Sequence, residues 1–146
     1  MNPKEFQYLA SKLAEHGVFA SEFRTAISRS YYAVYNLGIN LLKEMGFSIP
    51  KKSEAHEEMR RHFNNSGDIE LIEAAEKIKD LKTKRKHADY DLDRHDVEKK
   101  HNAKAYVYSA DRLIKTMEKQ CNGVNRSQII KSIQDWRKRP RIKRPT

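Results

Sequence analysis

Two short segments carry side chains whose presence packing alone does not explain. One is residues 85–91, Arg-Lys-His-Ala-Asp-Tyr-Asp, and the other is the arginine- and tyrosine-rich stretch from Arg24 to Asn36. Both lie in patterns of apolar residues spaced three and four apart, which predict amphipathic helices, and both place an arginine where the apolar stripe would continue. A guanidinium directed at a helix interface is costly unless a partner compensates its charge. Arg85 is therefore expected to bind either an internal carboxylate or an external anion such as phosphate.

The internal partner of Arg85 is predicted to be Asp89, because residues four apart lie on one face of a helix. Arg29, from the earlier segment, is a second candidate partner for the same carboxylate, and Asp91 would extend the structural network. The alternative, in which Arg85 faces a phosphate, is compatible with this network if the pair lies at a groove. Both interpretations stay open from the sequence.

The earlier segment also holds three tyrosines, whose rings can stack on nucleic-acid bases. Tyr31 falls on the apolar stripe and is predicted to be core, whereas Tyr32 points elsewhere and is the candidate base-stacking residue. The acidic and histidine side chains of residues 89–96 superficially suggest a metal site. They span a helix end, however, and Asp91 or Asp93 is better interpreted as the N-cap of the next helix. We therefore expect neither a metal nor a cofactor.

The periodicity of the chain predicts an all-α protein. Only five glycines and four prolines interrupt it, and no run of alternating apolar and polar residues is long enough for a strand. Helices are expected over residues 3–15, 21–45, 53–63, from 68 through the segment 85–91, 93–120 and 127–138. Short connections between the main helices predict an antiparallel bundle of four to five helices. Residues 1–122 would form this bundle, and residues 123–146 a short basic helix and tail appended to it.

Polar side chains mark the expected starts of several helices. Ser21, Ser53 and Asp68 each precede an apolar periodic segment and are predicted N-caps. The core stripe of the helix after Asp68 is expected to consist of Leu71, Ala74, Ile78, Leu81, Arg85 and Ala88. A charged residue thus takes a core position near the end of that helix.

The positive charge of the chain is concentrated at its C-terminus. The net charge is +10, and residues 123–146 hold eight lysines and arginines against Asp135 alone, which leaves only +3 for residues 1–122. Such a cluster favours a polyanionic partner through direct attraction and counterion release. The candidate nucleic-acid-binding residues are Arg24, Arg29, Tyr32, Arg137, Lys138, Arg139, Arg141, Lys143 and Arg144.

Cysteine content and hydropathy bound the environment of the protein. A single cysteine, Cys121, excludes an internal disulfide framework. No stretch has the apolar length of a membrane span, and the first residues lack the pattern of a signal peptide. We therefore expect a cytoplasmic protein without membrane contact.

The stretch Ser-Arg-Ser-Tyr-Tyr-Ala-Val-Tyr at 28–35, followed by Lys-Arg-Lys-His-Ala-Asp-Tyr-Asp at 84–91, resembles the HEPN superfamily. The resemblance is closest to a prokaryotic branch with an SRxYYA…RxxADYD pattern, and it covers roughly residues 3–120. It implies a helical bundle, commonly a dimer. In catalytic members of the family it implies a metal-independent endoribonuclease with an Arg-x4-6-His motif at the dimer interface, where the arginine steadies the phosphate and the histidine transfers protons.

The motif of this chain departs from that pattern at its histidine. Arg85 matches the arginine, but the residue five positions on is Tyr90, and His87 lies only two positions on. A tyrosine titrates near pH 10 and is a poor proton shuttle at neutral pH. Arg94 and His101 have a permitted spacing, but they lie near the start of the last long helix, and one such pair is expected by chance.

Two functions follow as hypotheses. The first is an RNA-binding HEPN module, non-catalytic or weakly catalytic, in a toxin–antitoxin, phage-defence or ribonucleoprotein assembly, and the missing histidine favours it. The second is a metal-independent endoribonuclease that uses Arg85 with His87, Tyr90 or a histidine supplied from elsewhere. As partners, the resemblance implies a second copy of the chain and a nucleotidyltransferase-like protein.

Overall fold

The computed structural model describes residues 1–140, and all of their regular secondary structure is helical. The main helices are α1 (Lys4–His16), α2 (Ala20–Glu44), α3 (Ala55–Asn64), α4 (Ile69–Tyr90), α5 (Lys100–Cys121) and α6 (Arg126–Lys138). A short 3-10 helix, η1 (Asp96–Glu98), precedes α5. The prediction of an all-α protein is thus confirmed, with no strand among residues 1–140.

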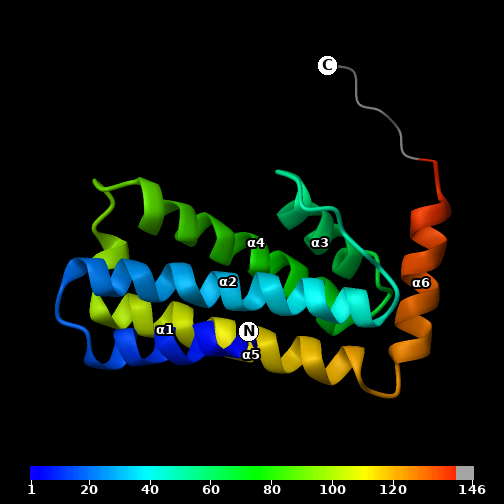
Figure 1. Ribbon diagram of the computed structural model, residues 1–146, viewed down its shortest axis with the longest axis horizontal. Coiled ribbons are helices and arrows are strands. Elements are labelled where there is room, and N and C mark those ends of the chain that lie inside the picture. The colour runs from blue at the N-terminus through cyan, green and yellow to red at the C-terminus, as the bar shows by residue number, and fades with distance from the viewer. Residues whose placement is uncertain (141–146) are drawn as a thin grey trace.

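Four long helices form an elongated bundle. α2 and α5 run in one direction, and α1 and α4 run in the other (Figure 1). α2 packs against α1, α4 and α5, so it is the central helix of the arrangement. α3 leans on α2 and α4, and α6 stands across one end of the bundle (Figure 1).

The core consists of two adjoining groups of buried side chains. The larger joins α2, α3, α4 and α5, and Tyr31 and Phe63 are among its fully buried members. The smaller joins α1 and the first half of α2 to α5, and it includes Val97 of η1. All six residues of the predicted core stripe of α4 are buried, Arg85 included.

The C-terminal segment, as far as residue 140, packs as part of the bundle. Ile129 and Ile133 of α6 are buried in the larger core group, and Ile130 and Trp136 lie partly buried against it. The chain after residue 122 therefore contributes apolar side chains to the same core and is more than a basic extension.

Two of the predicted N-caps are wrong. Ser21 lies inside α2, which begins at Ala20, and the carboxylate of Glu22 instead accepts hydrogen bonds from the backbone N–H groups of Val18 and Phe19. A glutamate in the first turn can thus accept hydrogen bonds from free backbone N–H groups at the helix start, in place of a capping serine. The second error concerns the start of α3, which begins two residues after Ser53, at Ala55, without a side-chain cap. Asp68 is confirmed, because its carboxylate accepts from the backbone N–H of Leu71.

The start of α5 also differs from expectation. Neither Asp91 nor Asp93 caps it, because the helix begins seven residues after Asp93, at Lys100. The intervening chain folds into η1 and buries Val97 completely. Several backbone carbonyls of this connection bind an arginine side chain of α2, which keeps them out of a helix, as described below.

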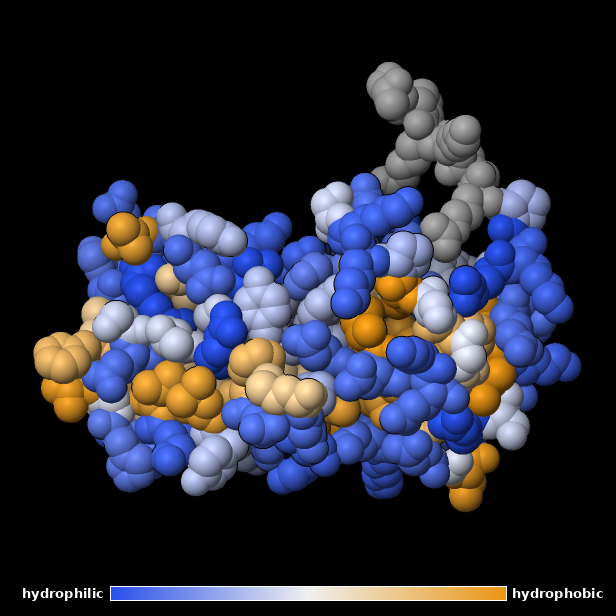
Figure 2. Space-filling model, viewed as in Figure 1, coloured by the Kyte–Doolittle hydropathy of each residue, from blue (hydrophilic) through white to orange (hydrophobic). Residues whose placement is uncertain are grey.

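The exterior is mostly hydrophilic on the face shown in Figure 2, where small hydrophobic patches interrupt it. None of the helices within residues 1–140 combines the length and the apolar character needed to cross a bilayer.

Gly38 marks a close approach between α2 and α3. A Cβ atom at this position would lie 2.9 Å from Sδ of Met59 and 3.2 Å from Cε2 of Phe63, both of which are fully buried. Only a glycine lets the two helices approach this closely without displacing those side chains.

We predict that Gly38→Val destabilises the protein by about 1–3 kcal/mol, because overpacking shifts Met59 and Phe63 from their positions. Urea denaturation followed by circular dichroism measures the change. Asn40→Val, at an exposed position of the same helix, controls for the helix propensity of valine and should shift the midpoint much less. Equal shifts for both variants would show that the helix contact at Gly38 is unimportant.

Candidate functional site

Arg85 is a buried cation that lacks hydrogen bonds. Only 7% of its surface is exposed, and within residues 1–140 none of its nitrogens donates a hydrogen bond to another residue. Its Nε atom is fully buried. The guanidinium lies 5.3 Å from the ring of Tyr31, 5.4 Å from that of Tyr32 and 5.9 Å from that of Tyr90. Aromatic faces stabilise a cation but leave its N–H groups available.

The predicted ion pair between Arg85 and Asp89 is present but long, with 3.6 Å between the guanidinium nitrogen and the carboxylate oxygen. The same oxygen atom accepts a hydrogen bond from the hydroxyl of Ser28 at 3.1 Å. Arg29 was the expected second partner of Asp89, but its guanidinium instead lies over the rings of Phe6 and Tyr32. The internal network therefore compensates Arg85 only partly.

A histidine from α3 completes the aromatic group beside Arg85. The ring of His56 stacks on Tyr35, with 3.8 Å between centroids and 3° between planes. Its Nδ1 atom lies 2.5 Å from the hydroxyl of Tyr31. Tyr31 is fully buried, as predicted, whereas Tyr32, Tyr35 and His56 are partly exposed. The four rings join α2 to α3 directly beside α4.

The electrostatic field around this group is positive. Partial burial and then the charges of Lys82, Arg85 and Lys86 lower the pKa of His56 from 6.5 to about 4. Burial and the neighbouring charge of Lys86 also lower the pKa of Lys82. A bound anion would lower the repulsion between these like charges. Within residues 1–140, neither Lys82 nor Lys86 forms a salt bridge, although the charge of Glu57 partly offsets that of Lys82.

The other two candidate catalytic residues lie at the end of α4. Tyr90 is 75% exposed, with its ring beside the Arg85 guanidinium. His87 is half-buried, and its Nδ1 atom is buried without a hydrogen-bond partner. The structure thus places Tyr90 at the surface beside Arg85, whereas His87 forms no hydrogen bond or ion pair with Arg85 within residues 1–140.

Arg24 has a different environment from the one expected of a nucleic-acid-binding residue. It is 8% exposed, and its Nε donates to the carboxylate of Glu98 at 2.9 Å. Its terminal nitrogens donate to five backbone carbonyls at the end of α4 and in the following connection, namely those of His87, Ala88, Asp91, Leu92 and Arg94. These bonds occupy its donors, so the prediction that Arg24 contacts nucleic acid is corrected: it is a structural residue.

The basic C-terminal residues lie on and beyond α6. The guanidinium of Arg137 lies 5.5 Å from the ring of Phe47, and Lys138 and Arg139 are exposed. The remaining candidates, Arg141, Lys143 and Arg144, lie outside the described residues.

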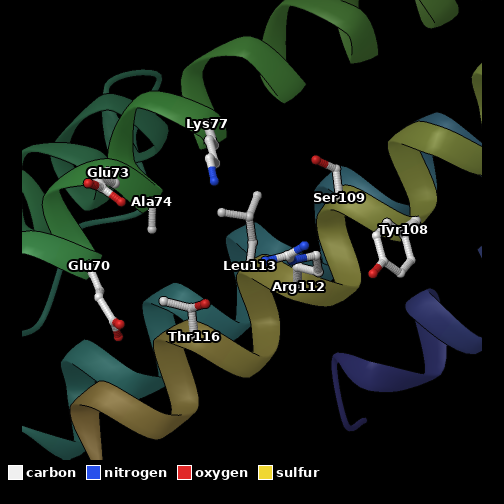
Figure 3. Close-up of a pocket in the computed structure, with 9 residues that line it drawn as sticks. All are labelled: Glu70, Glu73, Ala74, Lys77, Tyr108, Ser109, Arg112, Leu113 and Thr116. Atoms are coloured by element: carbon white, nitrogen blue, oxygen red, sulfur yellow. The ribbon is translucent and has the colours of Figure 1, made fainter.

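A separate groove of about 380 Å³ lies between α4 and α5 and does not include Arg85 (Figure 3). Lys77 and Arg112 project into it, with Glu70 and Glu73 toward one end (Figure 3). All four charged residues are exposed, and both signs of charge are present. This groove therefore lacks the buried, uncompensated charge that distinguishes the surface around Arg85.

Two of the acidic residues after α4, Asp96 and Glu98, form ion pairs. Asp96 binds Arg94 at 3.3 Å and Lys84 at 3.5 Å. Nowhere in residues 1–140 do three histidine, cysteine or acidic side chains come together as metal ligands would.

No protein family model, curated protein or solved structure matches this chain. The functional argument therefore depends on the site itself.

Sequence reasoning missed three residues of this site: His56, Lys82 and Lys86. The two lysines carried a usable signal, because Lys82 lies three residues before Arg85 and Lys86 one residue after it, so a helix brings all three charges close together. His56 carried no such signal. Its place in the site comes from the packing of α3 on α2, which no local pattern encodes.

We predict that Arg24→Lys destabilises the protein by about 2–4 kcal/mol, nearly as much as Arg24→Ala. A lysine restores the charge but not the planar fork, so buried carbonyls lose their donors. Urea denaturation gives the change, and Arg112→Lys, at an exposed position, is the matched control. Full rescue by lysine would show that charge alone matters at Arg24.

A second prediction concerns the proton affinity of His56. We expect its imidazole to titrate near pH 4 in ¹H–¹⁵N NMR spectra, and Lys82→Met to raise the pKa toward 6.5 by removing a nearby positive charge. Because the unfolded chain takes up this proton first, the contribution of His56 to stability should decrease as the pH falls from about 6.5 to about 4. Lys77→Met, in the separate groove, is the control, and an equal effect of both lysine variants would contradict the proposed source of the shift.

Proposed function

We propose that this chain is an RNA-binding module of the HEPN type, non-catalytic or weakly catalytic, in which the surface around Arg85 holds the RNA. The observation that carries the proposal is the buried guanidinium of Arg85, which donates no hydrogen bond within the described chain and lies beside Lys82 and Lys86. Burying such a group is costly, and a phosphate supplies both the missing charge and the missing acceptors.

The aromatic residues make a nucleic acid a better ligand than a free anion. The rings of Tyr32 and the exposed Tyr90 lie 5.4 Å and 5.9 Å from the guanidinium, so a base next to the bound phosphate would have an aromatic ring nearby. Stacking on tyrosine together with phosphate contacts is typical of proteins that bind single strands. The proposal of RNA over DNA rests on the resemblance to HEPN proteins.

The assignment to the HEPN type also has a structural argument. The two segments on which the resemblance depends contact each other, through Ser28 with Asp89 and through Tyr31 and Tyr32 with Arg85. Two motifs separated by 48 residues of the chain thus lie in contact on a helical bundle. This supports the resemblance without depending on any matching protein.

Fluorescence anisotropy with an end-labelled single-stranded RNA of mixed sequence tests the proposal. Arg85→Ala should weaken binding tenfold or more, which corresponds to at least about 1.4 kcal/mol, and it should reduce the dependence of affinity on salt. Arg112→Ala, an exposed arginine in the separate groove, is the control. RNA affinity that is unchanged in Arg85→Ala would refute binding at this surface.

The alternative is a metal-independent endoribonuclease in which Arg85 acts with Tyr90. The observation that favours it is that the Tyr90 ring lies beside the guanidinium at an exposed edge, where a scissile phosphate has access. Incubation with total RNA in EDTA separates the two functions. Cleavage that is lost in Arg85→Ala supports the nuclease, and binding without cleavage supports the module.

We further propose that basic residues of α6 contact the RNA. The module would act as a homodimer in a toxin–antitoxin, phage-defence or ribonucleoprotein assembly. A nucleotidyltransferase-like protein would be a further partner. Because α6 buries Ile129 and Ile133, its deletion would disturb the core, and charge removal at Arg137, Lys138 and Arg139 is the cleaner test. Light scattering during gel filtration tests the dimer.

A further inference from the structure

The positive charges around Arg85 are poorly balanced within residues 1–140. Lys82 precedes Arg85 by three residues on α4, and Lys86 follows it directly, so the helix brings the three cations close together. The ion pair that these cations form within the described chain is the long one from Arg85 to Asp89. The group therefore holds two positive charges that no carboxylate of residues 1–140 pairs.

Two nearby titratable side chains, Glu57 and His56, leave this balance unchanged. Glu57 already forms ion pairs with Arg60 and Arg61. His56 is uncharged at neutral pH, because partial burial and the neighbouring cations lower its pKa to about 4. A bound phosphate would thus face an excess of two cations.

The two kinds of phosphate in an RNA strand differ in charge. A phosphodiester inside the strand carries a single negative charge. A terminal phosphate monoester carries about 1.5 to 2 at pH 7, because its second pKa is about 6. The monoester is therefore the phosphate whose charge comes closest to that of the site.

The recessed position of Arg85 restricts the phosphates that can reach it. Only 7% of its surface is exposed, and the rings of Tyr31, Tyr32 and Tyr90 lie between 5.3 Å and 5.9 Å from the guanidinium. A phosphate inside a strand carries a nucleoside on each side, and both would have to fit beside these rings. A terminal phosphate has a nucleoside on one side only and presents three oxygens to the N–H groups. Burial and charge thus favour the same ligand.

We propose that the Arg85 site binds the phosphorylated end of an RNA strand, with the terminal phosphate monoester held by Arg85, Lys82 and Lys86. This inference rests on the proposed RNA-binding function and names the class of RNA that the same site selects. Arg85 would donate hydrogen bonds to the phosphate oxygens, and the two more exposed lysines would supply the remaining charge. The exposed ring of Tyr90 is available to the base of the terminal nucleotide.

Fluorescence anisotropy with four RNAs of one sequence tests the inference on the full chain. Each RNA is labelled at an internal base and measured in EDTA. One has hydroxyl groups at both ends, one has a 5′-phosphate, one has a 3′-phosphate, and one is closed into a circle. We expect a phosphate at one of the two ends to tighten binding about tenfold or more over the strand with hydroxyl ends. The circle, which has only phosphodiesters, should bind no more tightly than that strand.

The gain from the terminal phosphate should depend on the cations of the site. Arg85→Ala and Lys82→Met should each abolish most of it. Methionine keeps the apolar stem of the partly buried lysine, so Lys82→Met should fold even if the loss of Arg85 disturbs packing, and circular dichroism checks both variants. Arg112→Ala, in the separate groove, is the control and should keep the full gain.

A competition experiment separates a strand end from a free mononucleotide. Adenosine 5′-monophosphate should displace the phosphorylated strand only at much higher concentrations than the unlabelled strand itself, because it lacks the rest of the chain. Displacement at equal concentrations would assign the site to a mononucleotide and overturn the inference.

The remaining outcomes distinguish this inference from the proposed function. Equal affinity for all four RNAs, or a gain that both Arg85→Ala and Lys82→Met retain, would overturn the recognition of a strand end at this site while RNA binding itself stands. Absence of binding to any of the four RNAs would instead refute the function on which the inference rests.

Discussion

The guanidinium of Arg24 holds the end of α4, and with it the candidate site, in one conformation. From α2 it donates hydrogen bonds to the carboxylate of Glu98 and to five backbone carbonyls between residues 87 and 94. Carbonyls in the chain between α4 and α5 are therefore satisfied by a side chain instead of by helical hydrogen bonds. This explains why α4 ends where it does and why α5 begins only at Lys100. Because Tyr90 lies directly before this connection, and Arg85 five residues earlier, their positions depend on the hydrogen bonds that Arg24 donates from α2 to the end of α4.

Arg24 and Arg85 are both buried arginines, but their hydrogen bonding differs completely. Their exposures are nearly equal, at 8% and 7%, yet Arg24 donates to acceptors along its whole fork while Arg85 donates to none in the described chain. The burial of Arg24 is compensated inside the molecule. That of Arg85 is compensated only by aromatic faces and a long ion pair, in a neighbourhood of two further lysines. An uncompensated buried charge is expensive, and it is the kind of feature that concentrates at functional sites.

The sequence predicts the helices well because apolar residues spaced three and four apart form the buried faces of the helices in the structure. It places Arg85 on the core stripe of α4 and Tyr31 in the core, and both are buried. It fails where a tertiary contact overrides a local signal. Ser21 is a good capping residue by type, but Glu22 binds the N–H groups of Val18 and Phe19 instead. Asp93 lies within a connection whose carbonyls at Asp91, Leu92 and Arg94 bind Arg24. From the sequence, Arg24 is predicted to be a basic surface residue, but in the fold Glu98 and backbone carbonyls surround its guanidinium.

His56 is the site residue that the sequence predicts least well, and the reason is physical. Residues of one site are sought at fixed spacings in a sequence because one helix turn brings them together, but a histidine on α3 obeys no such spacing. It reaches the site because Gly38 lets α3 approach α2 closely, as the short distance from its missing Cβ to Met59 requires. The same approach stacks His56 on Tyr35. A substitution at Gly38 would then change the surroundings of His56 through packing alone, without changing any charged residue.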